Sequence, residues 1–159
     1  MVAETDGWDE VRLAQRPNGS VAWVRAANVS LTYSPWVIVV DTEETRVFLY
    51  DDGHVVASMP AGVGTTADPT PKGTFFVAYF AEAPNTGYGP WVMVTSAHSP
   101  TISDWDNSGD AQIAIHGPLG SDAQIGTTGA AISHGCVRLH NADLATLRQV
   151  PAGSLVVVD

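Results

Sequence analysis

The sequence predicts a mainly β protein with one short C-terminal helix. From Trp36 onward, short runs of β-branched and aromatic residues recur between turn residues, which is typical of strands. Only one segment, Asn141 to Val150, has apolar residues at helical spacing. With 159 residues, 45% of them hydrophobic, the chain is long and apolar enough to bury a core.

The strands are expected where these runs lie, paired mainly antiparallel. The runs are Trp36 to Asp41, Thr45 to Tyr50, His54 to Pro60, Gly73 to Phe80, Trp91 to Ser96, Gln112 to His116 and Ser154 to Val158. Asp51, Asp52 and Gly53 predict a tight hairpin turn between two of them. The stretch from Pro60 to Gly73 is rich in proline and glycine and predicts a longer ordered loop.

The helix is expected to begin with Asn141 as its N-cap and to end before Pro151. Asp143 suits the positive end of the helix dipole. The residues that share the apolar face are Leu144, Leu147 and Val150.

The N-terminal part of the chain differs in texture from the rest. Residues Pro17 to Ser20 form a turn between Val11 to Ala14 and Val21 to Arg25, which predicts a hairpin. Two strands alone are too small to be stable. We therefore do not expect this hairpin to be stable alone.

The charge balance narrows the range of partners. The chain has 17 acidic and 7 basic residues, which is opposite in sign to a phosphate-binding surface, so nucleic acid is not an expected partner. The acidic residues are scattered, as on a solvated surface. No apolar stretch is long enough to span a membrane, and Met1 to Glu10 lacks the pattern of a secretion signal.

The single cysteine, Cys136, excludes an intramolecular disulfide and is either a small buried hydrophobe or a reactive thiol. Its context favours reactivity, because Gly135 precedes it and His134 lies two residues before it. An ordinary thiol is mostly protonated at neutral pH, so a nucleophile needs a base or a cation nearby. The candidates for that role are His116, His134 and Arg138.

Two glycine positions fit a catalytic interpretation. Gly135 allows a tight turn that brings the backbone N–H of Cys136 close to a substrate carbonyl, where an oxyanion must be stabilised. His116 ends a predicted strand and is followed by Gly117, which places the imidazole at the start of a loop.

Other interpretations of the same residues remain open. A histidine at a strand end is often structural, and Arg138 could pair with Asp143 near the helix start. Zinc binding by His116, His134 and Cys136 is a further alternative, but the sequence has neither a recognisable zinc spacing nor a fourth ligand. We therefore expect no metal site and no cofactor.

Taken together, the motifs resemble those of the L,D-transpeptidase (YkuD-like) family. His116-Gly117 is followed, after a spacer ending at Ile132, by Ser133-His134-Gly135-Cys136-Val137-Arg138, which looks like the family signature. Gly62 to Phe75 resembles its Gly-x-Gly…Thr-Pro-x-Gly-x-Phe segment, and Asn141 to Leu144 resembles the start of its C-terminal helix. Val21 to Asn28 is similar to the end of an SH3-like domain that precedes the catalytic domain in some relatives. The resemblance therefore implies an SH3-like fragment or linker over residues 1–33 and an L,D-transpeptidase catalytic domain over residues 34–159.

The resemblance implies a YkuD-like β-sandwich and a role for each site residue. Cys136 would be the nucleophile and His116 its proton partner, oriented by the backbone carbonyl of Gly117. His134 would shape the pocket and support the oxyanion region. The residues expected around the oxyanion and the substrate are Gly135, Ser133, Arg138, Tyr88, Trp91 and Met93, of which the last three could equally be sheet core.

The resemblance also implies a reaction and partners. The thiol would take the acyl group of a peptidoglycan stem tetrapeptide, release the terminal D-Ala and form a 3→3 cross-link, and carbapenems would trap Cys136. An L,D-carboxypeptidase and a catalytically idle wall-binding module are the alternatives. The implied substrate places the protein outside the cytoplasm, in the cell envelope.

Overall fold

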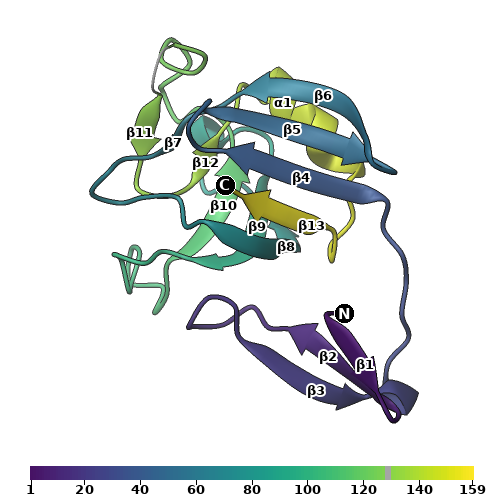
Figure 1. The fold of residues 1–159 in the computed structure, drawn as a ribbon. Coiled ribbons are helices and arrows are strands. Elements are labelled where there is room, and N and C mark those ends of the chain that lie inside the picture. The colour runs from purple at the N-terminus through teal and green to yellow at the C-terminus, as the bar shows by residue number, and fades with distance from the viewer. Residues whose placement is uncertain (128–129) are drawn as a thin grey trace.

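A computed structural model describes residues 1–127 and 130–159 and shows a mainly β protein with one short α-helix, as predicted (Figure 1). The elements are β1 (Ala3–Thr5), β2 (Trp8–Arg12), β3 (Val21–Arg25), η1 (Ala26–Asn28), β4 (Trp36–Asp41), β5 (Arg46–Asp51), β6 (His54–Pro60), β7 (Val63–Gly64), β8 (Gly73–Ala81), η2 (Thr86–Tyr88), β9 (Val92–His98), β10 (Gln112–His116), β11 (Ala131–Ser133), β12 (Val137–Arg138), α1 (Asn141–Thr146), η3 (Leu147–Gln149) and β13 (Leu155–Val158).

Most of the strands form one curled sheet in the order β12-β10-β9-β8-β13-β4-β5-β6. Among the described residues, seven strand pairings are antiparallel and three are parallel. The C-terminal β13 lies between β8 and β4 and joins the two halves of the sheet. At one edge, β12 pairs in parallel with β10.

The predicted strands agree closely with the observed ones. The bounds of β4, β6 and β10 are as predicted, and the other predicted strands of the large sheet differ by one or two residues at an end. Asp52 and Gly53 have φ values of 48° and 80°, as a two-residue hairpin turn requires. Strands β7, β11 and β12 were not predicted, because two or three residues are too few to show an alternating pattern.

The C-terminal helix corrects one prediction. Its N-cap is His140, whose carbonyl accepts the first helical hydrogen bond from the N–H of Leu144 at 2.9 Å, so Asn141 is the first helical residue and not the cap. The helix tightens into the 3-10 turn η3 after Thr146. The predicted apolar face is confirmed, since Leu144, Leu147 and Val150 are buried against the sheet as part of the main core.

The N-terminal residues form a separate three-stranded antiparallel sheet, β1-β2-β3, which lies apart from the large sheet in Figure 1. The predicted bounds of the first strand of this hairpin, Val11 to Ala14, are wrong. The strand is β2, because Arg12 pairs with Val21 and the backbone N–H of Leu13 already closes the loop onto the carbonyl of Ser20 at 2.9 Å. The SH3-like origin of this segment stays a prediction.

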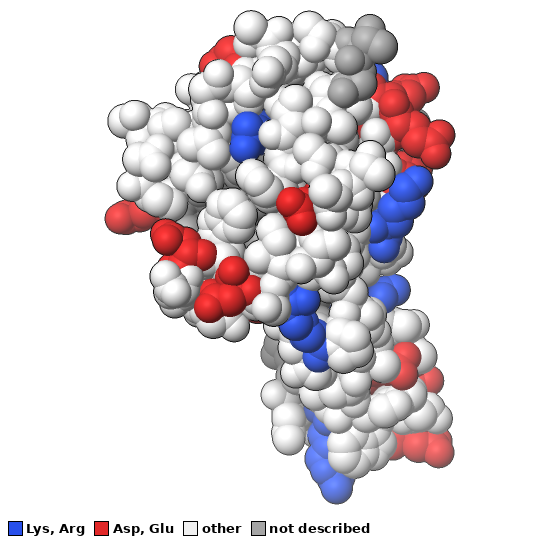
Figure 2. Space-filling view, turned by 90° about the vertical axis from the view of Figure 1, so that its left-hand side faces the viewer, with Lys and Arg blue, Asp and Glu red and all other residues white. Residues whose placement is uncertain are grey.

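The surface carries acidic and basic side chains in separate small groups on the face shown in Figure 2. Among the described residues, no helix has the length and apolar character needed to cross a membrane.

Candidate active site

A groove of about 610 Å³ opens over one face of the sheet, beside the parallel pair of β10 and β12. Its floor is apolar and consists of Val92, Val94 and Ala114, against which Cys136 packs. Because side chains alternate along a strand, Met93 points to the opposite face of the sheet and is fully buried in the main core. The groove therefore belongs to one face of β9 and β10.

The strand pairing brings the predicted nucleophile and its partner to the same face. In the parallel pair, Ile115 lies opposite Val137 and His116 lies opposite Arg138. Residues two apart share a face. Cys136, one residue before β12, therefore projects to the same side as Arg138 and His116. Both line the groove, together with Ser133, His134, Arg138 and Tyr88. The structure thus brings together side chains from three distant parts of the chain.

His116 is held in a single tautomer. Its Nδ1 lies 2.7 Å from the carbonyl oxygen of Gly117, and a carbonyl can only accept, so Nδ1 carries the proton and Nε2 keeps its lone pair. Burial lowers the pKa of His116 to about 4, although the hydrogen bond to Gly117 raises it; the charge of Arg138 lowers it further. The imidazole is therefore neutral at physiological pH and can accept a proton at Nε2.

Gly117 is needed for this geometry because the chain is crowded there. A Cβ at this position would lie 2.7 Å from the backbone nitrogen of Gly89 and 2.6 Å from the side-chain oxygen of Asn141. The N–H of Gly117 donates to the carbonyl of Tyr88 at 2.7 Å, and the Tyr88 ring lies 4.6 Å from the imidazole of His116. The loop that carries η2 therefore holds the histidine from one side.

Cys136 is half-buried and rests as a neutral thiol. Burial raises the pKa of the Cys136 thiol, while a hydrogen bond from the backbone of Ala114 and the charge of Arg138 lower it by less. A neutral thiol beside a neutral imidazole can react when the imidazole takes the proton during attack.

The turn that presents Cys136 is braced by buried hydroxyl groups. Ser133 Oγ donates to the carbonyl of Cys136 at 2.5 Å and accepts from the N–H of Gly135 at 3.1 Å. Thr70, buried in the loop before β8, donates to the carbonyl of Gly135 at 2.8 Å and accepts from the N–H of Gly64 at 2.9 Å. These bonds fix a turn in which Gly135 has φ of 115°.

That φ value explains why glycine precedes the cysteine. An L side chain rarely adopts a φ of 115°, and a Cβ on Gly135 would lie 2.8 Å from the side chain of Ile113. The turn therefore depends on a residue without a side chain, as the sequence predicted.

Arg138 lies in the groove without a carboxylate partner among the described residues. Its Nη1 donates to Ser121 Oγ at 3.0 Å, and its buried Nε has no hydrogen-bond partner there. The alternative of an ion pair between Arg138 and Asp143 does not occur in this part of the chain. The guanidinium is thus a partly buried cation that faces the groove.

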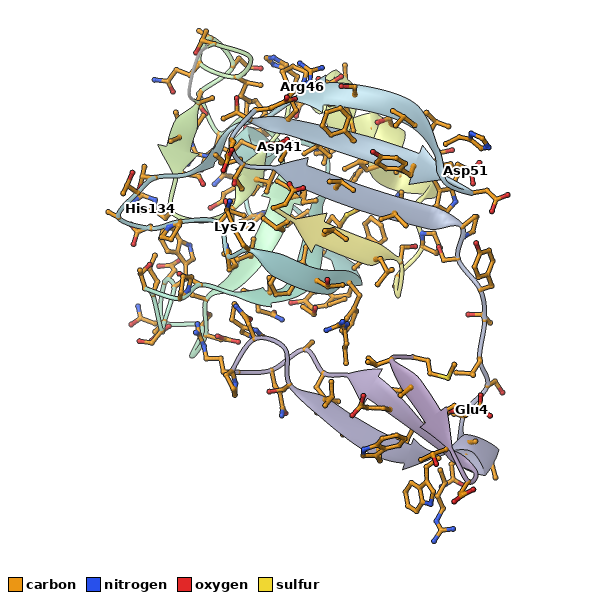
Figure 3. The ribbon with its side chains drawn as sticks, in the orientation of Figure 1. Glu4, Asp41, Arg46, Asp51, Lys72 and His134 are labelled. Atoms are coloured by element: carbon orange, nitrogen blue, oxygen red, sulfur yellow. The ribbon has the colours of Figure 1, made fainter. Side chains whose placement is uncertain are left out.

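The remaining predicted residues divide between the groove and the core. His134 is exposed at the edge of the molecule (Figure 3), where its ring lies 5.3 Å from that of Trp105. Tyr88 lines the groove. Trp91 packs against the main core, with its ring 5.4 Å from that of Phe80, and Met93 lies within that core, so neither is among the described residues that line the groove.

Sequence reasoning missed three residues that shape the site: Thr70, Trp105 and Ser121. Thr70 belongs to the Thr-Pro segment that carried part of the resemblance, but only the fold shows that it bonds to the turn before Cys136. The other two lie in loops where no local pattern indicates a role. Within the described residues, no group of three or more His, Cys, Asp or Glu side chains is arranged to hold a metal ion.

The fold and the groove together define a β-sheet protein with a candidate cysteine nucleophile on a glycine turn and a histidine in the same groove. The family model for the L,D-transpeptidase catalytic domain, YkuD, matches residues 35–158, and the chain belongs to this family.

Two groups of relatives agree with this assignment. A YkuD protein of Bacillus licheniformis is 27% identical over 126 residues, which cover 78% of this chain and 66% of that protein, just under two thirds of its length. An L,D-transpeptidase from Mycobacterium smegmatis has a similar fold, with a TM-score of 0.62, 20% identity and coverage of 99% of this chain and 80% of the other. The LD transpeptidase LdtMt1, solved in complex with imipenem, gives a TM-score of 0.60 at 16% identity, covering 89% and 64%. The predicted YkuD-like β-sandwich is confirmed at the level of the fold.

Proposed function

We propose that this protein is a peptidoglycan L,D-transpeptidase that forms 3→3 cross-links through an acyl-enzyme on Cys136. The observation that carries the proposal is the shared placement of the Cys136 thiol and the neutral His116 imidazole in one groove. Membership of the L,D-transpeptidase family supports the choice of substrate.

In the first step, the Cys136 sulfur attacks the carbonyl of the third residue of a stem tetrapeptide while the S–H proton passes to His116 Nε2. The resulting oxyanion accepts a hydrogen bond from the backbone N–H of Cys136, with His134 beside it; losing one such donor costs about 10²–10³ in rate in other enzymes. The C–N bond to D-Ala then breaks, and His116 returns the proton to the leaving amine. The product is a thioester on Cys136.

In the second step, the side-chain amine of a diamino acid on another stem attacks the thioester. His116 takes the proton from this amine, the new amide forms, and the thiolate leaves and is reprotonated. If water attacks in place of the amine, the product is a free tripeptide, which is the carboxypeptidase outcome.

Arg138 fits a role in binding the donor. Stem peptides carry carboxylates. Among the described residues, the partly buried guanidinium of Arg138 has no acidic partner, so a substrate carboxylate can form charge-assisted hydrogen bonds with it. This gives Arg138, together with Tyr88, a proposed role in substrate binding. Carbapenems, which mimic the acyl donor, would acylate Cys136. We also propose that the protein acts in the cell envelope, where its proposed substrate lies.

Incubation with a purified tetrapeptide donor and an amine acceptor, followed by mass spectrometry, tests the proposal. We expect a cross-linked product with release of D-Ala, and no product with the Cys136→Ala variant. Tripeptide alone would replace transfer by hydrolysis as the function. An unchanged donor with folded protein would favour a catalytically idle wall-binding module and overturn the proposal.

A further inference from the structure

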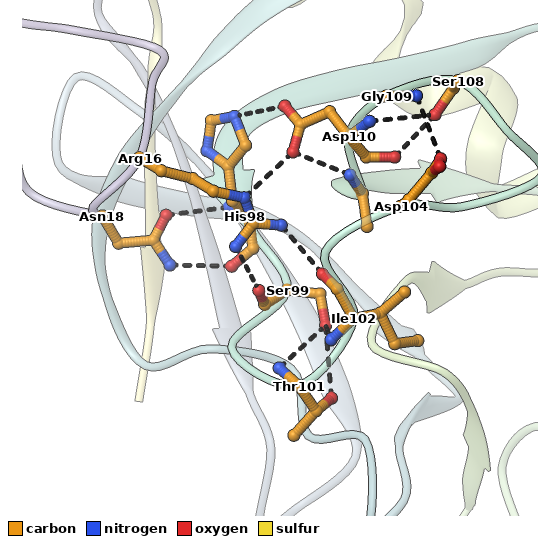
Figure 4. Close-up of polar contacts among 11 residues, drawn as sticks. Arg16, Asn18, His98, Ser99, Thr101, Ile102, Asp104, Ser108, Gly109 and Asp110 are labelled. Carbon is orange, nitrogen blue, oxygen red and sulfur yellow. Dashed lines mark hydrogen bonds and ion pairs between the residues drawn. The ribbon is translucent and has the colours of Figure 1, made fainter.

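The loop between β2 and β3 of the N-terminal sheet reaches the segment that connects β9 to β10 (Figure 4). Arg16 donates from all three guanidinium nitrogens at once. Its Nη1 bonds to the carbonyl of Ser99 at 2.7 Å and its Nη2 to the carbonyl of Ile102 at 2.8 Å. Its Nε pairs with a carboxylate oxygen of Asp110 at 3.1 Å.

Asn18, in the same loop, binds His98, the last residue of β9 and the residue just before this segment. Its side-chain amide donates to the carbonyl of His98 at 2.8 Å, and its side-chain oxygen accepts from the N–H of His98, also at 2.8 Å. The Asn18 side chain therefore satisfies the backbone N–H and C=O of His98, as a neighbouring strand would, at the end of β9. Arg16 binds both ends of one segment, at Ser99 and Ile102 and at Asp110, and Asn18 binds the residue just before it.

That segment, residues 99–111, is a wall of the groove. Ile102, Trp105, Asp106 and Asp110 line the groove within it. The Trp105 ring lies 5.3 Å from that of His134, two residues before Cys136. A displacement of this wall would therefore alter both the width of the groove and a contact with the catalytic motif.

The wall contains no strand or helix to hold it. Its ends are joined by a 2.8 Å hydrogen bond from the N–H of Ser99 to the carbonyl of Ala111, and a second backbone bond, also 2.8 Å, runs from the N–H of Trp105 to the carbonyl of Asp110. Asp110 is the point where the restraints meet, because it also lies 2.9 Å from the buried Nε2 of His98 and accepts from the N–H of Ala111 at 2.7 Å. Arg16 is the restraint on this network that comes from outside the large sheet.

We propose that Arg16 and Asn18 are positioning residues for the donor site, and that the N-terminal sheet thereby acts as part of the enzyme. The two side chains hold the 99–111 wall in the conformation that binds the acyl donor. This inference rests on the proposed function and adds to it a role for a segment outside the region matched by the family model.

The effect of losing the contacts of Arg16 and Asn18 can be calculated from the fraction of molecules whose wall is in the binding conformation. If the wall is in its binding conformation for only a fraction of the time, the apparent affinity for the donor falls by that fraction, whereas the reaction after binding is little changed. A tenth of the population in the binding conformation would weaken binding about tenfold.

The test measures acylation of Cys136 by a carbapenem over a range of concentrations, with hydrogen–deuterium exchange of peptides from residues 99–111. The variants are Arg16→Met, which keeps most of the side-chain length, Arg16→Lys, which keeps the charge but cannot reach three acceptors, and Asn18→Ala. The matched control is Arg12→Met on β2. Within the described part of the chain, the Arg12 side chain makes no hydrogen bond or ion pair. Thermal unfolding of each variant shows that it is folded.

We expect Arg16→Met and Asn18→Ala to raise the half-saturating carbapenem concentration about tenfold, with a limiting rate within about threefold of the native protein. Exchange in residues 99–111 should become faster, and Arg16→Lys should resemble Arg16→Met more than the native protein. Variants that match Arg12→Met in both measurements would overturn the inference, as would faster exchange with unchanged acylation. If the native protein is not acylated at all, the proposed function fails, and exchange alone then decides whether the wall is held by Arg16 and Asn18.

Discussion

The two sides of the groove are built differently. On the proposed catalytic side, His116 ends β10, and Cys136 lies one residue before β12, the strand that pairs with β10. Thr70 joins the glycine turn before Cys136 to the backbone of Gly64. On the opposite side, residues 99–111 form a wall without strand or helix. It is restrained by backbone bonds across the loop, by the bond from Thr101 to Asp68 and by side chains from the N-terminal segment. The proposed reacting groups thus lie at a strand ladder, whereas the wall lies outside the ladder and is held by a few backbone hydrogen bonds together with side chains.

This difference has a physical consequence. Acyl transfer needs the thiol and the imidazole within a narrow range of geometry, which a strand ladder provides, since its hydrogen bonds break only with local unfolding. A wall held by side chains opens at a lower free-energy cost and can admit a bulky peptide. Changes on the catalytic side should therefore reduce the rate of the chemical step, and changes on the wall should reduce affinity.

The largest expected effect comes from His116→Gln, on the catalytic side. The amide cannot act as a base, so the limiting rate of carbapenem acylation should fall by about 10²–10⁴. Rapid-quench mass spectrometry measures this rate. A fall of less than about tenfold in a folded variant would remove the proton-transfer role from His116.

The pH dependence tests the same side without a mutation. Because the pKa of His116 is lowered to about 4, the imidazole stays neutral until the pH falls through that value, and protonation then removes the lone pair that accepts the thiol proton. The acylation rate should fall about tenfold per pH unit below the midpoint. Circular dichroism at each pH confirms that the protein is folded. An inflection near the ordinary histidine pKa of about 6.5 would contradict the buried, neutral imidazole.

A smaller effect is expected on stability, where the buried hydroxyl of Thr70 should contribute more than the exposed hydroxyl of Thr101. Thr70→Val removes the hydroxyl that joins Gly64 to Gly135 and leaves both backbone groups without it, so the free energy of unfolding should fall by about 1–3 kcal/mol. The matched change on the wall, Thr101→Val, removes an exposed hydroxyl that bonds to Asp68 and should change it by less than about 0.5 kcal/mol. Urea denaturation measures both. Equal effects would mean that the two sides are equally braced.

The smallest effect is expected for Trp105→Leu. The substitution removes the ring that contacts His134 but no reacting group, so the half-saturating carbapenem concentration should rise a few-fold with an unchanged limiting rate. Trp23→Leu, at an exposed tryptophan of the N-terminal sheet, is the control. A fall in the limiting rate as large as that of His116→Gln would show that the wall takes part in the chemical step.

Sequence reasoning succeeded where the determinants are local. Runs of β-branched and aromatic residues between turn residues predicted β4, β6 and β10, and the Asp52-Gly53 turn has the predicted geometry. A short motif led us to expect His116 and Cys136 in one site, and both line the groove. It failed where a role depends on residues far apart. The grip of Arg16 on Ser99 spans 83 positions and leaves no local pattern.

The predictions of the helix N-cap and of Met93 as a groove residue failed for related reasons. Asn141 suits a cap by type, but the first hydrogen bond of the helix starts from His140, which only the chain path decides. Met93 and Val94 are adjacent apolar residues of one strand, and their different surroundings depend on which face of the sheet is covered. Val94 lines the groove, whereas Met93 lies in the core.

The most direct test of the central claim is intact-protein mass spectrometry after incubation with a carbapenem, comparing the native chain with Cys136→Ala. We expect one covalent adduct on the native protein, mapped to Cys136 by peptide analysis, and none on the variant. A folded native protein without an adduct, or an adduct that persists in Cys136→Ala, would contradict the assignment of Cys136 as an activated nucleophile in a donor-shaped groove.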